Sequence, residues 1–370
     1  KSLVGNGDFY AKGSSTSAYP LNTIQPAAIL VSDFKVPNGI GGISAVQYSY
    51  EGARFHRAGK GFLGFEKTTT SDLTIGTRTV IENQLNTTYY ASIPYKTTTY
   101  LGTSSTILNS TTLTNVFVSP AAKRFWVKST GLLENNNLTG RSVNTTSTYD
   151  DTNGNITYSK MDVNSGVEIT ETTTVYGAFP GSILNKPTSV TIATTRNGQT
   201  PADSVVTGFD YNSIGQLTSK TDFSGTAKSV MTSYEYNSFG NPTSTTVTPS
   251  GMIARTSSSV YDSKGRYPES STNPLSQGSS ATYDPKWGKP LTVTGIDGLT
   301  TSSTYDGFGR TSTTTYPGPY TANQTYIWDT SNGAVWRGDL TYPAQGKPDT
   351  KTWYDLLGRQ IRTETEGFGG

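Results

Sequence analysis

The chain has 370 residues, a formal net charge of +2 and no cysteine. The lack of cysteine excludes disulfides, thiolate zinc sites and a cysteine nucleophile. Because 29 basic residues are balanced by 27 acidic ones, the sequence also lacks the basic footprint of a nucleic-acid-binding protein. No run of 18 or more apolar residues is present, so we expect no membrane-spanning helix.

The composition predicts β-sheet. Ser and Thr make up more than a quarter of the residues, and 11% are aromatic, including 23 tyrosines. Thr and Tyr favour pleated, half-buried surfaces, and large rings can bury area where aliphatic side chains are few. Long segments with helical apolar spacing are missing, so we expect an all-β, mostly antiparallel protein. In the first part of the chain we expect long, irregular strands, for example over residues 87–100 and 115–128.

A glycine-rich aromatic segment follows a Tyr-Ser-Tyr sequence at residues 48–50. The spacing of its glycines matches a dinucleotide-binding fingerprint by letter, but that fingerprint needs a helix after the glycines. The Thr-rich residues that follow favour a strand instead, so we expect no nucleotide cofactor. The segment predicts a strand kinked by Gly59, Gly61 and Gly64, with Phe62, Leu63 and Phe65 in the core.

The candidate catalytic and metal-binding residues lack the further residues that such sites need. His56 is the only histidine, and a Ser-His-Asp triad or a histidine metal site needs further groups. We expect a partly buried or surface side chain beside Arg54 and Arg57. Asp150 and Asp151 begin a turn with the composition of a calcium loop but not its spacing; loose calcium binding and an Asx turn stay open, and the turn is favoured. We therefore predict no catalytic, cofactor-binding or metal-binding residues.

A short pattern, Tyr-Asp/Asn-x-x-Gly followed by Arg, Asn or Gln, recurs in the second part of the chain. Its tyrosines are 22 to 25 residues apart between Tyr211 and Tyr305, and the last copy follows 49 residues later. That long interval contains Trp328-Asp329, a degenerate copy. Such a period is typical of stacked supersecondary units. The residues of the copies are Tyr149, Tyr211 with Gly215, Tyr236 with Gly240, Tyr261 with Gly265, Tyr283 with Gly288, Tyr305 with Asp306, Gly309 and Arg310, and Tyr354 with Asp355, Gly358 and Arg359.

Each position of the pattern has a role in a hairpin turn. The Tyr ends a strand and packs its ring. The Asp or Asn accepts a hydrogen bond from the backbone two residues later, and the Gly supplies the positive φ that the turn requires. The residue after the Gly leads into the outgoing strand. Because a single hairpin is marginal in water, neighbouring repeats must stack to complete a core.

These copies resemble the YD repeat of the RHS (rearrangement hot spot) family, which includes the B and C components of insecticidal Tc toxins and, distantly, the teneurins. The resemblance covers about residues 149–370. The glycine-rich aromatic segment is similar to the region before the repeats in SpvB-like and TcB-like proteins. The resemblance implies a long β-sheet strip that curves and spirals into a hollow shell, which encloses a C-terminal toxic domain or its own core.

One family feature is missing at its usual place. RHS cores end in an Asp-Pro-x-Gly autoprotease motif, whereas the nearest string here, Asp284-Pro285-Lys286-Trp287-Gly288, is one residue longer and lies inside a repeat. The chain also opens and stops within strand-like sequence. We therefore expect it to be a fragment of a larger protein.

The sequence predicts an irregular β leader at residues 1–140 and a repeat array at 141–370. The expected function is a non-catalytic scaffold, part of a shell that encapsulates or presents a toxin or C-terminal polypeptide. The expected partners are the rest of the polypeptide and the enclosed toxin domain, in a bacterial protein that is secreted or held at the cell surface.

Two other functions stay open. A surface adhesin or carbohydrate-binding protein would bind glycans through exposed Tyr and Trp such as Trp328, although packing is the favoured role of the five tryptophans. A polysaccharide-cleaving β-solenoid would need a pair of clustered acidic residues.

Overall fold

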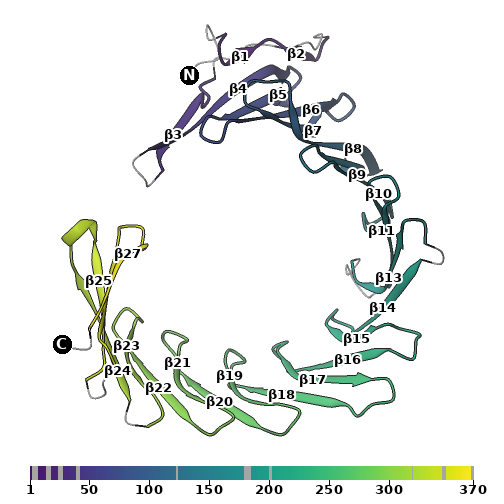
Figure 1. The fold of residues 1–370 in the computed structure, drawn as a ribbon. Helices are drawn as coiled ribbons and strands as arrows, with labels where there is room; N and C mark the ends of the chain where they lie inside the picture. Colours follow the sequence, from purple (N-terminus) through teal and green to yellow (C-terminus); the bar gives the residue numbers. More distant parts are fainter. Residues whose placement is uncertain are drawn as a thin grey trace. The chain divides into compact units, whose positions relative to one another are not determined.

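The protein is all-β. The structure, a computed structural model, describes the chain except residues 2–6, 14–17, 24–27, 39–41, 122–123, 179–184, 200–201, 319, 344–346 and 368–370. The described residues form 27 strands and one short 3-10 helix, and the strands are almost all antiparallel (Figure 1). This confirms the predicted fold class. The chain divides into two compact units, Lys1–Gly208 and Phe209–Gly370.

The first unit contains most of the long strands. From β4 onward, each strand pairs with the next one in the sequence. The strands are β1 (Tyr10–Ala11), β2 (Leu21–Thr23), β3 (Asp33–Pro37), β4 (Ile43–His56), β5 (Gly61–Asp72), β6 (Thr77–Asn86), β7 (Ala91–Leu101), β8 (Ile107–Ala121), β9 (Arg124–Asn136), β10 (Arg141–Tyr149), β11 (Ile156–Val163), β12 (Glu168–Tyr176), β13 (Pro187–Arg196) and β14 (Asp203–Tyr211), which contains the boundary between the units.

A small aromatic core lies on β4 of this unit. The short strand β1 pairs with β4 in parallel, and this pairing places Phe9 and Tyr10 against Ala53 as a buried cluster. Tyr50 and Phe65 pack against the same cluster, with their ring centroids 4.8 Å apart. Rings therefore supply core area that the sparse aliphatic residues do not.

Both predicted long strands of the first region have wrong bounds. Residues 115–128 form a hairpin and not one strand, because β8 ends at Ala121, β9 starts at Arg124, and Val118 pairs with Trp126 across the two. Residues 87–90 form a turn before β7, and Tyr90 there has a φ of +50°. Neither turn carries a Gly or an Asn-Gly pair, the residues by which such turns are recognised in a sequence.

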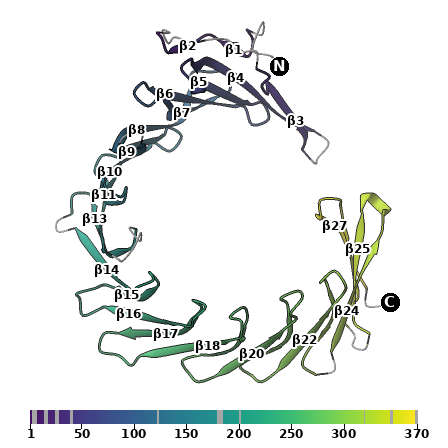
Figure 2. The same cartoon turned by 180° about the vertical axis from the view of Figure 1, so that it is seen from behind.

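The second unit contains shorter strands, of five to eight residues. Consecutive hairpins follow one another along an arc within this unit (Figures 1 and 2). Its elements are β15 (Leu217–Asp222), β16 (Val230–Tyr236), β17 (Pro242–Pro249), β18 (Arg255–Tyr261), β19 (Pro268–Thr272), β20 (Gly278–Tyr283), β21 (Pro290–Thr294), β22 (Thr300–Tyr305), β23 (Thr311–Thr315), β24 (Thr321–Trp328), the 3-10 helix η1 (Ser331–Gly333), β25 (Trp336–Thr341), β26 (Thr350–Tyr354) and β27 (Gln360–Thr365).

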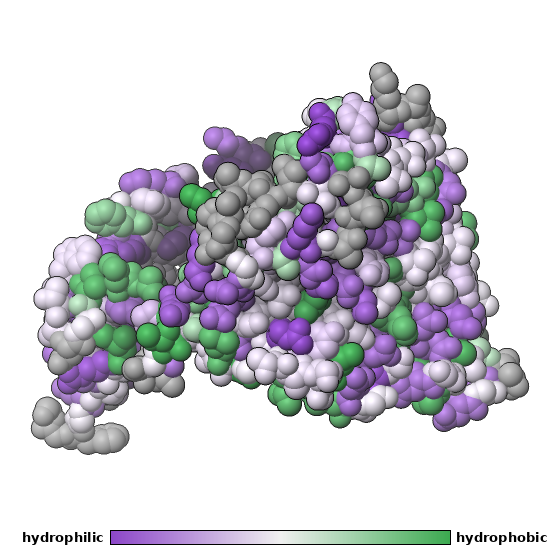
Figure 3. Space-filling view, turned by 90° about the horizontal axis from the view of Figure 1, so that it is seen from above, coloured by the Kyte–Doolittle hydropathy of each residue, from purple (hydrophilic) through white to green (hydrophobic). Residues whose placement is uncertain are grey.

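Hydroxyl pairs across neighbouring strands explain the use of Thr in this unit. The Oγ1 atoms of Thr282 and Thr292 are 2.6 Å apart, and those of Thr294 and Thr300 are 2.8 Å apart. Such cross-strand pairs stabilise a sheet without a dry core. On the face seen in Figure 3, hydrophobic side chains accordingly form small patches among hydrophilic ones. Among the described residues we find no helix long and apolar enough to cross a membrane.

Candidate functional site

The predicted turn residues lie at the ends of strands, as the copy at Tyr305 illustrates. β22 ends at this tyrosine. The Asp306 carboxylate accepts hydrogen bonds from the backbone N–H groups of Phe308 and Arg310, both at 2.9 Å. Gly309 has a φ of +77°, a conformation that costs other residues strain. The glycines of the other copies have φ values between +65° and +86°: Gly215, Gly240, Gly265, Gly288 and Gly358.

Two of the tyrosine hydroxyls join consecutive repeats of the second unit. Tyr305 donates to the carbonyl oxygen of Pro290 at 2.6 Å, and Tyr236 donates to that of Leu217 at 2.7 Å. Each acceptor is the first residue of the outgoing strand of the preceding copy. Two tyrosines of the first unit also donate to carbonyls of a preceding strand or its start, Tyr149 to Ser129 and Tyr176 to Ile156.

Aromatic side chains cover two of the glycines. A Cβ atom on Gly265 would lie 2.5 Å from the ring of Phe239, and one on Gly309 would lie 2.6 Å from the indole of Trp287. Both aromatic residues stand directly before the glycine of the preceding copy. These glycines are therefore needed for close approach as well as for their φ. We call this series of tyrosine bonds and covered glycines the turn ladder.

Ion pairs close the turns that carry Asp and Arg. Asp306 pairs with Arg310 and Asp355 with Arg359, each at 2.7 Å. The backbone N–H of Arg359 lowers the pKa of Asp355 and its guanidinium lowers it further, while partial burial acts in the opposite direction. These carboxylates therefore stay charged at neutral pH, as a turn-capping role requires.

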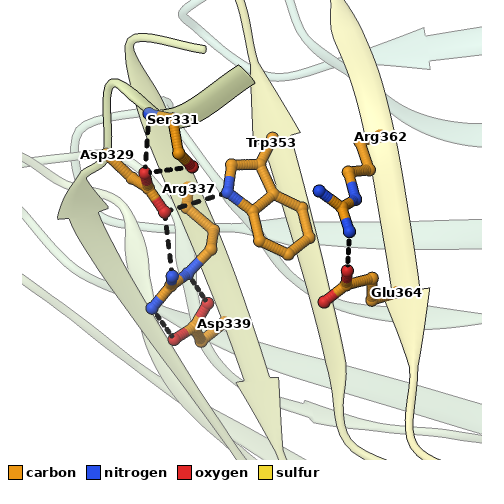
Figure 4. Close-up of polar contacts among 7 residues, drawn as sticks. All are labelled: Asp329, Ser331, Arg337, Asp339, Trp353, Arg362 and Glu364. Carbon is orange, nitrogen blue, oxygen red and sulfur yellow. Dashed lines mark hydrogen bonds and ion pairs between the residues drawn. The ribbon is translucent and has the colours of Figure 1, made fainter. Parts of the chain in front are cut away.

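The degenerate copy at Trp328 is held by a different polar cluster (Figure 4). One carboxylate oxygen of Asp329 accepts from the backbone N–H and the hydroxyl of Ser331, at 3.0 and 2.6 Å. The other accepts from Arg337 Nη1 and from the indole N–H of Trp353, both at 2.9 Å. Arg337 also donates two hydrogen bonds to Asp339, at 2.6 and 2.9 Å.

The contacts of this cluster indicate a structural role, since they join β25 and β26 to Asp329. The Ser331 hydroxyl contributes most to lowering the pKa of Asp329 to about 2, whereas a carboxyl acting as general acid needs a raised pKa. Asp329 and Asp339 also share the guanidinium of Arg337, which offsets their charge. Sequence reasoning found Asp329 but missed Arg337, Asp339 and Trp353, because these residues lie on β25 and β26 and no local motif marks them.

The comparisons with known proteins agree with the turn geometry. The RHS Repeat family matches residues 211–251, which contain the copies at Tyr211 and Tyr236 and the strands between them. This segment of the chain is therefore similar in sequence to the RHS repeat. A search of curated proteins finds no sequence match.

The fold of the chain is similar to three crystal structures of TcdB2-TccC3. The first lacks the hypervariable C-terminal region and aligns with a TM-score of 0.66 at 9% identity, over 88% of this chain and 28% of that one. The form named TcdB2-TccC3-TEV gives 0.65 at 9% identity, again over 88% and 28%. TcdB2-TccC3 itself gives 0.59 at 10% identity, over 87% and 26%. The chain therefore spans just over a quarter of the length of these structures.

The glycine-rich aromatic segment at residues 59–65 forms a bulged hairpin in the first unit. Gly59 lies in the turn, and Gly61 and Gly64 lie on β5, with φ values of +72° and +94°. Phe65 packs against the core cluster as predicted. Phe62 is 48% exposed, so its predicted place in the core is wrong. The pairing register shifts at Arg54/Phe55, and such a bulge re-aims side chains relative to simple alternation.

The two remaining polar candidates act within turns. His56 is buried, and its Nδ1 accepts a hydrogen bond from the backbone N–H of Lys60 at 3.2 Å, as Asp306 accepts from Arg310. Asp150 accepts from the backbone N–H of Thr152 at 2.9 Å, which is the Asx-turn contact. No group of three or more metal-ligating side chains occurs within the described ranges.

Proposed function

We propose that this chain is a structural part of an RHS shell that encapsulates or presents an associated toxin or C-terminal polypeptide, without turnover of its own. The turn ladder carries the proposal. Its contacts join the copies at Tyr236, Tyr261 and Tyr305 to the copies before them, so neighbouring repeats stack on one another, as in other repeat proteins. The likeness to TcdB2-TccC3, one structure of which is described as lacking a hypervariable C-terminal region, supports this function.

The surface chemistry of the strands is compatible with enclosing a polypeptide. Several Ser and Thr hydroxyls are paired across neighbouring strands, and on the face seen in Figure 3 hydrophobic side chains form small patches among hydrophilic ones. Such a wall would contain a chain without a dry interface that holds it in one conformation. In this proposal residues 1–140 start the wall and 141–370 continue it.

We also propose that the protein is secreted or held at the bacterial surface, and that it associates with the rest of its polypeptide and with other toxin components. Similarity to TcdB2-TccC3 supports the secreted location and the association with toxin components.

Limited proteolysis of the natural polypeptide that contains this chain tests the proposal. We expect a segment outside residues 1–370 to resist trypsin. Deletion of residues 283–304 removes one whole repeat and moves Tyr305 into the place of Tyr283, so the sheet should still fold but form a shorter wall. The protected segment should then be cut faster. Equal digestion of every outside segment in both proteins would contradict encapsulation.

A further inference from the structure

The regular turn ladder is interrupted after Phe308. In the copy at Tyr305, five residues separate the end of β22 from the start of β23. Between the end of β24 at Trp328 and the start of β25 at Trp336 there are seven residues, which include η1. Phe239 and Trp287, the residues equivalent to Phe308 in earlier copies, lie over a glycine of the next turn. Gly333, in the turn that follows the copy at Tyr305, has no side chain within 4 Å of its Cβ position. Phe308 is 79% exposed, compared with 60% for Phe239.

A pocket of about 360 Å³ lies at this interruption. Its volume falls in the range of small-molecule sites. All of its lining residues belong to the second unit: Phe308, Arg310, Tyr326, Ile327, Trp328 and Trp336. The pocket is therefore built mostly from aromatic rings on one edge of the repeat sheet.

Two of these rings, those of Phe308 and Trp328, are open to a ligand. Trp328 is 81% exposed, although it occupies the position at which other copies place a packed tyrosine. Trp336 is already stacked on Tyr354, with ring centroids 3.9 Å apart, and therefore forms a fixed wall. Aromatic residues that lie open in a concave site, at a place where the repeat pattern breaks, indicate binding more than packing.

The charged group that lines the pocket, the guanidinium of Arg310, is paired with a carboxylate. The Arg310 guanidinium lies 4.1 Å from the ring centroid of Tyr326 and pairs with Asp306 at 2.7 Å. Because Asp306 offsets the positive charge of Arg310, the pocket has little net charge with which to attract an anion. The Asp306 carboxylate also accepts hydrogen bonds from the backbone of its own turn. A guanidinium has five donors in one plane, and the bonds to Asp306 use only part of that set.

We propose that this pocket binds one neutral sugar ring of a glycan. The apolar face of a pyranose would stack on Trp328 or Phe308, whose faces attract polarised C–H groups. The guanidinium of Arg310 would donate to ring hydroxyls at the rim. An apolar peptide side chain would cover this guanidinium without accepting its hydrogen bonds, which costs free energy, so the sugar is the better match. This site is independent of the scaffold function.

Tryptophan fluorescence and ligand-observed NMR with the purified full chain test this site. The probes are the methyl glycosides of glucose, galactose, mannose and N-acetylglucosamine, together with trisaccharides of each. We expect saturable binding of at least one probe, with saturation transfer to its ring C–H protons. Trp328→Ala and Phe308→Ala should weaken that binding about tenfold or more, and Arg310→Gln should weaken it about tenfold.

Leu356→Ala is the matched control, because Leu356 is 82% exposed on another turn of the same edge and should leave binding unchanged. Circular dichroism checks that each variant folds. The proposal is overturned if no probe binds up to about 10 mM, or if Trp328→Ala binds as the unchanged chain does. Binding of an apolar tripeptide that is lost in Trp328→Ala, without sugar binding, would assign the pocket to a peptide instead.

Discussion

The two units stabilise the same kind of antiparallel sheet by different means. In the first unit, β4 and β8 are 14 and 15 residues long, and a buried cluster of Phe9, Tyr10 and Ala53 anchors the N-terminal strands. In the second unit, several strands have only five residues, and the turn ladder joins their ends. The difference teaches that a sheet can be stabilised either along long strands with a local core or at its turns.

The largest effect is expected in the aromatic core of the first unit. Phe9→Ala should destabilise the first unit by about 3–5 kcal/mol, because Phe9 is buried against Tyr50 and its removal leaves a cavity. Hydrogen exchange of the β4 and β5 amides measures the change. Ile75→Ala, at a turn residue that is 69% exposed, should change stability by less than about 0.5 kcal/mol. Similar losses in both variants would refute a local core.

The next-largest effect separates two roles of glycine in the turn ladder, which are to adopt a positive φ and to leave space for a neighbouring ring. Gly358→Val meets nothing within 4 Å, so it should cost about 1–3 kcal/mol from backbone strain alone. Gly309→Val adds a clash with Trp287, and overpacking of this kind costs about 1–3 kcal/mol more. Urea unfolding of both variants measures the difference. Equal stabilities would mean that Trp287 does not hold its place over Gly309.

A smaller effect is expected from the hydroxyl that joins two repeats. Tyr305→Phe removes the donor to Pro290 and should cost about 0.5–1.5 kcal/mol. Tyr305→Leu also removes the ring and should cost more, so the pair separates hydrogen bonding from packing. If Phe at this position is as stable as Tyr in urea, the hydroxyl does not contribute to the ladder.

The smallest effect concerns the dependence of stability on pH. The pKa of Asp329 is lowered to about 2 from 3.8, so its stabilising contribution is present above about pH 4 and is lost as pH falls toward 2. Ser331→Ala removes the largest cause and should raise this pKa. Carboxyl NMR titration of the chain and the variant measures the change. An unchanged midpoint would show that the other donors hold Asp329 by themselves.

The sequence was sufficient for the fold class and for the turns that carry the YD pattern. Tyr305, Asp306 and Gly309 act on backbone within a few residues of themselves, so their spacing alone predicts a turn. The division of residues 115–128 between β8 and β9 could not be found in this way, since no turn-forming residue marks it in the sequence and only strand pairing defines it.

The polar and aromatic groupings of the second unit were beyond sequence reasoning. Arg337 and Trp353 reach Asp329 from two later strands, and that meeting depends on register across the sheet. The exposure of Phe62 has a similar origin, because a single bulge decides which way its side chain points. Local chemistry was therefore predictable here, and contacts between strands were not.

The direction of the turn-ladder contacts bears on how the protein is made. The hydroxyl of Tyr236 donates to the carbonyl oxygen of Leu217, and Gly265 is covered by Phe239. Leu217 and Phe239 come earlier in the sequence than the residues that contact them, so they are synthesised first. A repeat with such contacts thus packs on residues that lie on its N-terminal side, and it can dock before the next repeat is synthesised. Vectorial synthesis, which proceeds from the N-terminus, would then extend the sheet in the order of translation and keep unpaired edges short-lived.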